Sequence, residues 1–172
     1  LDITRRKQAE DERDRLFNLS LDLLCVAGFD GQLQQINPAW TECLGWTAEE
    51  LTSRPMLDFI LPEDHAVTRR VREKIYQGVP VRGFENRYRC KDGSYRWLSW
   101  TVHPLMESRQ VFSVARDITE HKQALERLQA NEAGLAEAQR IARLGSWRFD
   151  LATNLLPWSD ELYRIFEIDR SQ

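Results

Sequence analysis

The sequence predicts an α+β protein built around an antiparallel sheet. Two short segments with strand character come first, at 23–29 and 33–36, and three longer ones come last, at 81–90, 95–103 and 110–117. The connections within each group are short, as in antiparallel hairpins, and helical segments lie between the groups. Of the 172 residues, 42% are hydrophobic and 30% are charged, which allows both an apolar core and a polar surface.

The N-terminal elements follow from local signals. Residues 5–24 are predicted to be helical, because they contain no glycine or proline and their leucines gather near the end, where a core should begin. Asp30-Gly31 is a hairpin turn signal between the first two strands. Asn37-Pro38 then starts a short helix that stops at Gly45.

The middle of the chain contains two more helical signals. Thr47 stands three residues before Glu50, which is the pattern of a capping box. Pro62 opens a longer helix that runs to Gly78. Within that helix an apolar stripe recurs at every fourth position and should face the core: Val67, Val71 and Ile75.

The last three strands and the exit helix complete the prediction. Alternation in the fourth strand places Leu98, Trp100 and Val102 on one face. The fifth strand ends at Asp117, and a long helix capped by Thr119 runs to about residue 142.

An internal repeat divides the chain. Residues 2–9 read DITRRKQA and residues 117–124 read DITEHKQA, an offset of 115. A weaker echo links residues 36–40 to residues 158–162, at an offset of 122. The simplest organisation is the end of one unit with a linker helix (1–15), a complete unit (16–120), an exit helix (121–145) and the start of a further, incomplete unit (146–172).

The complete unit resembles the PAS sensory domain with its C-terminal PAC portion. The resemblance depends on the order and spacing of several short motifs: Asp30-Gly31, Ile36-Asn37-Pro38-Ala39, Leu44-Gly45-Trp46, Pro62-Glu63-Asp64, Lys91-Asp92-Gly93, Tyr95-Arg96-Trp97 and Arg116-Asp117-Ile118-Thr119-Glu120. It implies a five-stranded antiparallel sheet of order 2-1-5-4-3, with helices on one face that can enclose a ligand. It also implies helices flanking the domain that carry signals.

Composition restricts the kinds of binding partner and the cellular location that are expected for this protein. A net charge of −3 does not favour nucleic acid, and no apolar run approaches the length of a membrane span. Cys25, Cys43 and Cys90 lie far apart without a C-x-x-C spacing, which predicts reduced thiols, a cytoplasmic protein and no metal site. The three histidines are isolated and no catalytic motif is present, so the segment is predicted to be non-enzymatic.

A ligand pocket is expected between the sheet and the helices. Aromatic side chains could stack a ligand that Asn86, Tyr88 and Ser113 orient. Alternatively, the aromatic rings fill the space themselves and Asn86 bonds the backbone, which is the favoured interpretation. The candidate lining residues are Ile36, Trp40, Leu57, Val67, Val71, Ile75, Phe84, Asn86, Tyr88, Trp100, Val102, Val111 and Ser113.

No cofactor is predicted, although a noncovalently bound small molecule or flavin stays open. Haem-binding members of the family mostly use a histidine on the long helix, and the stripe of that helix contains none, so haem is disfavoured. Flavin-photoadduct members need a cysteine in the short helix, and the corresponding residues 54–59 contain none.

Signal transmission is assigned to Asp117, Ile118 and Thr119. The strand ends and the helix begins within these three residues, so the segment that connects the sheet to the helix is very short. The family assigns this element the coupling role. Arg87, Arg89 or Lys91 is expected to pair with Asp117.

The partners follow from the flanking helices and from the resemblance. Leucines of the exit helix fit an a/d register, which predicts a homodimer, unless the stripe packs on its own domain. The apolar side chains of residues 147–172 should be covered by a second chain or by the first domain. The parent is expected to be a tandem-PAS sensor histidine kinase with a downstream effector domain. The alternatives are a diguanylate cyclase or phosphodiesterase, and a ligand-free dimerisation scaffold.

Overall fold

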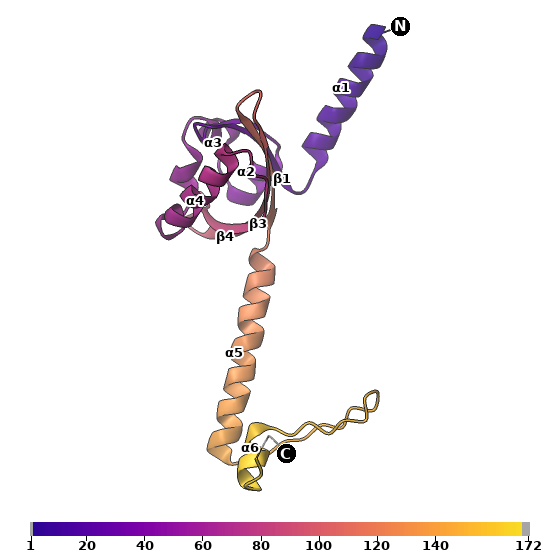
Figure 1. Ribbon diagram of the computed structural model, residues 1–172, viewed down its shortest axis with the longest axis vertical. Helices are drawn as coiled ribbons and strands as arrows, with labels where there is room; N and C mark the ends of the chain where they lie inside the picture. Colours follow the sequence, from indigo (N-terminus) through magenta and orange to yellow (C-terminus); the bar gives the residue numbers. More distant parts are fainter. Residues whose placement is uncertain (1, 170–172) are drawn as a thin grey trace. The chain divides into compact units, whose positions relative to one another are not determined.

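The computed structural model describes residues 2–169 (Figure 1). Leu1 and residues 170–172, which belong to the predicted segments 1–15 and 146–172, lie outside the described residues. The chain divides into two compact units, Leu1–Lys122 and Gln123–Gln172.

The first unit contains the predicted antiparallel sheet. Its spatial order is β2-β1-β5-β4-β3, and every neighbouring pair of strands is antiparallel. Both the fold class and the strand order therefore agree with the expectation from sequence. The strands are β1 (Leu23–Gly28), β2 (Leu33–Ile36), β3 (Val81–Arg89), β4 (Tyr95–Leu105) and β5 (Gln110–Asp117).

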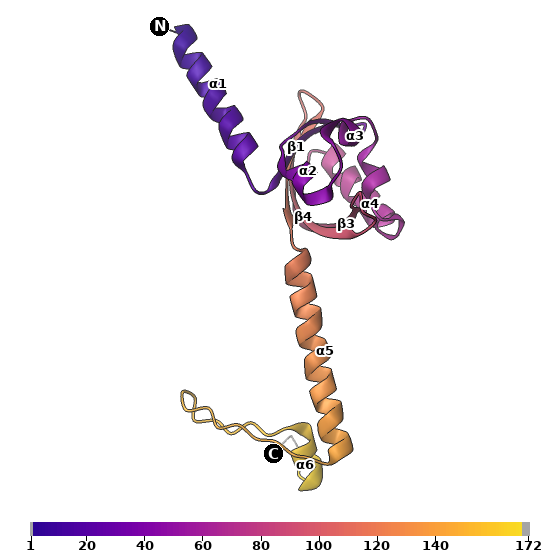
Figure 2. The ribbon, with the colours of Figure 1, turned by 180° about the vertical axis from the view of Figure 1, so that it is seen from behind.

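Helices and 3₁₀ turns between β2 and β3 cover one face of the sheet (Figure 2). They are α2 (Ala39–Leu44), α3 (Ala48–Thr52), η1 (Met56–Phe59), η2 (Pro62–Asp64) and α4 (His65–Tyr76). Outside the sheet the chain forms α1 (Asp2–Leu19), α5 (Thr119–Ala142) and α6 (Asp160–Ile165).

Two local signals work as the sequence predicts. Gly45 ends α2 with a φ of 77°, a left-handed conformation that glycine adopts without steric cost. Thr47 Oγ1 accepts from the Glu50 N–H at 3.1 Å, and Glu50 Oε2 accepts from the Thr47 N–H at 2.8 Å, which completes the capping box.

Two helix boundaries differ from the prediction. The first helix ends at Leu19 instead of residue 24, because Asn37 fixes the following residues in an extended path. Its Oδ1 accepts from the Leu24 N–H at 2.9 Å, and its Nδ2 donates to the backbone oxygens of Ser20 and Asp22. The helix predicted from Pro62 to Gly78 begins as the 3₁₀ turn η2 and becomes α-helical only at His65.

The core lies between the sheet and the helical layer. Trp40, Tyr88 and Trp100 form its aromatic centre, with ring centroids 5.5 to 6.0 Å apart. Alternate residues of the three long strands point inward, as the period of two predicts: Asn86 and Tyr88, Leu98, Trp100 and Val102, and Val111, Ser113 and Ala115 are all buried.

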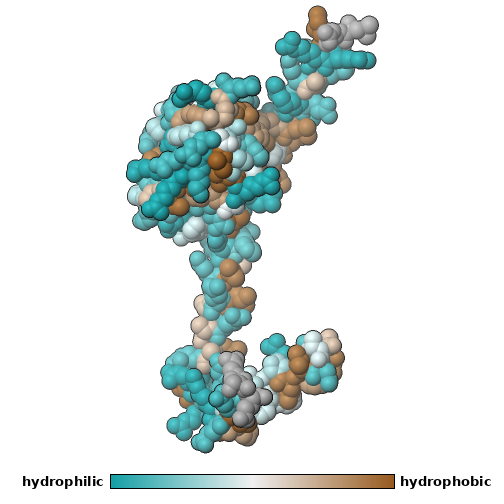
Figure 3. Space-filling model, in the orientation of Figure 1, coloured by the Kyte–Doolittle hydropathy of each residue, from teal (hydrophilic) through white to brown (hydrophobic). Residues whose placement is uncertain are grey.

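The second unit consists of most of α5, a hairpin and α6. Isolated bridges join Trp147 to Trp158 and Asp150 to Leu155. Large apolar side chains are exposed along α5 and the hairpin (Figure 3). Among the described residues, none of the helices has the length and apolar character that crossing a bilayer requires.

Candidate functional site

A small cavity of about 70 Å³ lies between the inner face of the sheet, η1 and α4. Pockets for organic ligands usually enclose roughly 300–1,000 Å³. The aromatic side chains therefore occupy most of the space that a ligand would need. The predicted residues that line it are Leu57, Val71, Ile75, Phe84, Asn86, Tyr88, Trp100, Val102, Val111 and Ser113.

Three predicted pocket residues lie elsewhere. Val67 is 43% exposed and does not line the cavity, whereas its neighbour Thr68 is buried and does. The reason is the helical repeat of 3.6 residues: Val67 lies about 80° from Ile75 around α4, whereas Thr68 lies only about 20° from it. Trp40 is completely buried in the aromatic centre, and Ile36 packs at the edge of the core.

The cavity is also lined by residues that were not predicted from the sequence. Arg72 Nε donates to the Tyr76 Oη at 2.9 Å, and the Tyr76 O–H donates to the Phe29 carbonyl at 2.5 Å. The i, i+4 spacing of Arg72 and Tyr76 on α4 was an available signal. The end of the Arg72 side chain also lies close to Gly31, which has a φ of 86°. The other lining residues that were missed are Ala27, Gly28, Met56 and Ile60.

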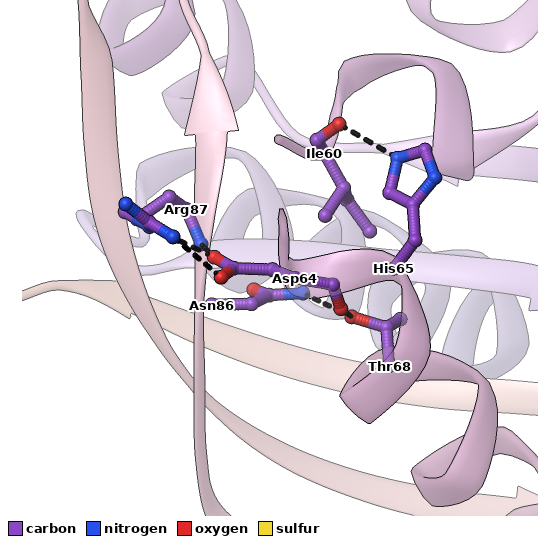
Figure 4. A network of polar contacts seen from close by, with 6 residues as sticks. All are labelled: Ile60, Asp64, His65, Thr68, Asn86 and Arg87. Carbon is purple, nitrogen blue, oxygen red and sulfur yellow. Dashed lines mark hydrogen bonds and ion pairs between the residues drawn. The ribbon is translucent and has the colours of Figure 1, made fainter. Parts of the chain in front are cut away.

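A buried hydrogen-bond chain connects the cavity to the start of α4 (Figure 4). Trp100 Nε1 donates to Asn86 Oδ1 at 2.7 Å, and Asn86 Nδ2 donates to Thr68 Oγ1 at 3.3 Å. The Thr68 hydroxyl in turn donates to the Asp64 carbonyl at 2.7 Å. Asn86 therefore bonds two side chains, and not the backbone as the filled-core interpretation assumed.

Asp64 clamps the start of α4 to the edge strand β3. Its carboxylate accepts three hydrogen bonds from Arg87: from the backbone N–H at 2.8 Å, from Nε at 3.0 Å and from Nη2 at 2.7 Å. The Leu61 N–H donates to the Arg87 carbonyl at 3.0 Å, which covers part of the open edge of β3. His65 Nε2 lies 2.9 Å from the Ile60 carbonyl. These contacts hold the polar end of the cavity wall in place.

The buried ionisable groups near the cavity are electrically neutral. Burial raises the pKa of Cys25 to about 12 and raises the pKa of Tyr88 well above its ordinary value. Burial also raises the pKa of Cys43 to about 12, with a further contribution from Asp117. None of these groups is ionised near neutral pH. No cluster of three metal-ligating side chains occurs within residues 2–169.

The Asp64–Arg87 pair predicts an acid-sensitive contribution to stability. Hydrogen bonds from the Arg87 guanidinium lower the pKa of Asp64. The stabilisation is therefore fully present above about pH 4, the ordinary pKa of aspartate, and is lost as pH falls through the lower pKa of the folded state. Asp64→Asn is expected to lower the free energy of unfolding by about 1–3 kcal/mol at pH 7.

Urea unfolding at pH 7 and at several values below pH 4 checks this expectation, with Glu63→Gln as the control for loss of an adjacent exposed carboxylate. The difference between Asp64→Asn and the native chain should shrink with acidification. A difference that is the same at every pH would contradict the linkage.

The junction between β5 and α5 is held by side-chain hydrogen bonds. Asp117 Oδ1 accepts from the Thr119 N–H at 2.9 Å and from its hydroxyl at 2.5 Å. The Ile118 N–H donates to the Trp97 carbonyl at 2.9 Å, and the Trp97 N–H donates to Thr119 Oγ1 at 2.8 Å. The cap of α5 is thus supplied by Asp117, whereas the Thr119 hydroxyl ties the helix to β4.

The predicted ion-pair partners of Asp117 were wrong. Its carboxylate lies 3.5 Å from Arg96, and the Cys43 thiol donates to it at 3.6 Å. The three predicted cations, which lie on β3 or in the turn after it, bind other acceptors: Arg87 binds Asp64, Arg89 binds the Asp58 carbonyl and Lys91 binds Glu50.

Comparison with known proteins identifies the domain type. Residues 34–116 match the family model described as PAS fold. The chain is 27% identical over 158 residues to the probable diguanylate cyclase DgcE of Escherichia coli, covering 84% of this chain and 14% of that protein. It is 28% identical over 123 residues to the sensor histidine kinase TmoS of Ectopseudomonas mendocina, covering 69% of this chain and 13% of that protein.

A solved structure supports the fold. The PAS domain of an HTR-like protein from Haloarcula marismortui superposes with a TM-score of 0.57 at 21% identity, covering 65% of this chain and 99% of that one. The chain spans about one seventh of the length of the two curated relatives.

Proposed function

Because residues 34–116 belong to the PAS family, we propose that this chain is a sensory and signal-transmitting segment of a larger receptor. The observation that carries the proposal is the junction of Asp117 to Thr119, which joins the last strand to a helix of 24 residues through one intervening residue. A change in the sheet must therefore move the start of α5. Substitution of Asp117 in the receptor tests the proposal, because regulation of the effector should then be lost.

The receptor is proposed to be a cytoplasmic sensor histidine kinase whose effector lies on the same polypeptide. The similarity to TmoS supports this assignment, and the similarity to DgcE supports a diguanylate cyclase as the alternative. Three free cysteines suit a reducing compartment. The segment itself is proposed to be non-catalytic.

A ligand-free scaffold is the second candidate function, because the cavity of about 70 Å³ is small. We expect the freshly purified chain to show no visible absorption, and mass spectrometry of its extract to contain no stoichiometric small molecule. Denatured protein of the same concentration is the control for the extract. A flavin or haem spectrum would contradict this expectation and would require the core to open around the ligand.

Residues 146–172 are proposed to begin a second copy of the unit. The bridge between Trp147 and Trp158 repeats the pairing of Cys25 with Ile36, 122 positions later in both cases (147 − 25 and 158 − 36). The Ser146 N–H donates to the Ser159 side chain at 2.9 Å, as the Leu24 N–H donates to the Asn37 side chain at 2.9 Å, again 122 positions apart.

Backbone pairing and helix placement extend this correspondence. The Ser159 N–H donates to the Ser146 carbonyl, and the Asn37 N–H donates to the Leu24 carbonyl. The short helix α6 then follows Ser159 as α2 follows Asn37. Three apolar side chains that are exposed in this hairpin correspond to buried positions of the first copy: Trp147, Phe149 and Leu155 correspond to Cys25, Ala27 and Leu33. This supports the proposed boundaries of 16–120 for the complete domain and 121–145 for the linker helix.

Self-association through the flanking helices is also proposed. Leu125, Leu128 and Leu135 are 46–62% exposed on α5, at a spacing that suits a seam with a second copy. Leu125→Lys combined with Leu128→Lys is expected to shift the chain toward monomer in sedimentation velocity measured over a concentration series. Leu151→Lys, at an 88% exposed position outside the helices, is the matched control. A native chain that is monomeric at all concentrations would contradict the proposal.

A further inference from the structure

Trp97 is the meeting point of β3, β4 and α5. In the sheet it is paired with Arg87 of β3. Its backbone carbonyl accepts from the Ile118 N–H, and its N–H donates to Thr119 Oγ1. Both polar backbone groups of this single residue therefore hold the exit of the chain into α5.

The indole ring of Trp97 has two cations beside it. The Arg87 guanidinium carbon lies 5.2 Å from the ring centroid, and Lys122 Nζ lies 5.1 Å from it. Such distances allow cation–π attraction. Lys122 belongs to the first turns of α5, and its ammonium also pairs with Glu85 of β3 at 2.6 Å. The ring thus links a cation of the edge strand to a cation of the exit helix.

The other side of Arg87 reaches the cavity wall. Its guanidinium and backbone N–H bind Asp64, whose side chain is only 13% exposed. The backbone carbonyl of Asp64 accepts from the Thr68 hydroxyl, and that hydroxyl accepts from the cavity residue Asn86. Figure 4 shows these partners converging where η2 meets α4.

We propose that Arg87 is a positioning residue that couples the start of α4 to the first turn of α5 through the ring of Trp97. This inference rests on the proposed function and adds a second route beside the covalent one from β5. A displacement of α4 moves Asp64, Asp64 moves the guanidinium, and the changed contact at Trp97 alters how Lys122 and Thr119 are held.

Residue-resolved amide hydrogen exchange on the 172-residue chain tests the proposal. The reporters are the N–H groups of Ile118 and Lys122, which bond the carbonyls of Trp97 and Ile118. Asp64→Asn and Arg87→Gln are each expected to accelerate exchange at these amides by about tenfold, although neither side chain bonds them. Glu63→Gln and Arg82→Gln, exposed neighbours on the same two elements, should change it less than about twofold.

A double-mutant cycle separates coupling from general destabilisation. In a Trp97→Leu background, Asp64→Asn should add less than about a twofold further change, because the link is already absent. Arg87→Lys keeps the charge without the planar fork and should give an intermediate rate. Protection of the β1 and β5 amides reports the change in global stability, and the acceleration at Ile118 and Lys122 must exceed the change at those amides.

Two results would overturn the inference: native exchange at Ile118 and Lys122 in Asp64→Asn, or effects of Asp64→Asn and Trp97→Leu that simply add. Because the readout needs no effector, its failure is distinct from failure of the proposed function. If the proposed function fails instead, receptor output does not change when Asp117 is substituted, although the exchange coupling between Asp64 and Ile118 persists.

Discussion

Trp40→Ala is expected to lower the free energy of unfolding of the first unit by about 3–5 kcal/mol, a large part of the stability of an ordinary domain. Trp40 has no exposed surface and contacts the rings of Tyr88 and Trp100. Its removal leaves a cavity between α2 and the sheet that the rigid aromatic neighbours cannot refill. Trp40 Nε1 also donates to the Leu24 carbonyl at 3.1 Å, and this bond is lost.

Chemical denaturation followed by far-UV circular dichroism measures this effect. Trp147→Ala is the matched control, because Trp147 is 66% exposed and the same truncation there should change the stability of the first unit by less than about 0.5 kcal/mol. Equal losses for the two variants would show that Trp40 does not occupy the centre of the core.

Asp117→Ala is expected to leave the domain folded and to abolish regulation of the effector in the receptor. The carboxylate holds the Thr119 N–H and hydroxyl and lies beside Arg96 and Cys43, so its loss weakens the attachment of α5 to the sheet. The loss of a helix cap costs about 1 kcal/mol, which a domain of this size tolerates. The ratio of effector output with and without the stimulus should fall to about 1, since the sheet no longer biases the helix.

The measurement is effector activity in the full receptor, together with the unfolding midpoint of the isolated chain. Asp22→Ala is the control, because Asp22 also pairs with an arginine beside the junction, Arg116, but its carboxylate does not accept from the Thr119 N–H or hydroxyl. Asp117→Asn keeps an acceptor for the Thr119 N–H and should retain part of the regulation. Full regulation in Asp117→Ala would remove the junction from the mechanism.

Each error of the sequence prediction has a physical reason. Val67 was placed in the core because it stands eight residues before Ile75, but that spacing turns by about 80° around α4, and Thr68 takes the inward position instead. The cation beside Asp117 was sought on β3, although the register of the sheet places Arg96 of β4 there. Nothing in the local pattern indicated that Arg87 and Lys122 would both lie beside the ring of Trp97.

The amino-acid sequence alone predicts most of the elements, their caps and the inward face of each long strand. These features depend on contacts within a few residues: a Thr47–Glu50 capping box, a glycine that ends α2, and alternation along β3 to β5. The volume of the cavity, the cation beside Asp117 and the contacts that Asp64, Arg87 and Trp97 make between α4 and α5 became visible in the folded chain. Those contacts join residues far apart in the chain, and they are fixed by strand register and side-chain packing, which depend on the whole core at once.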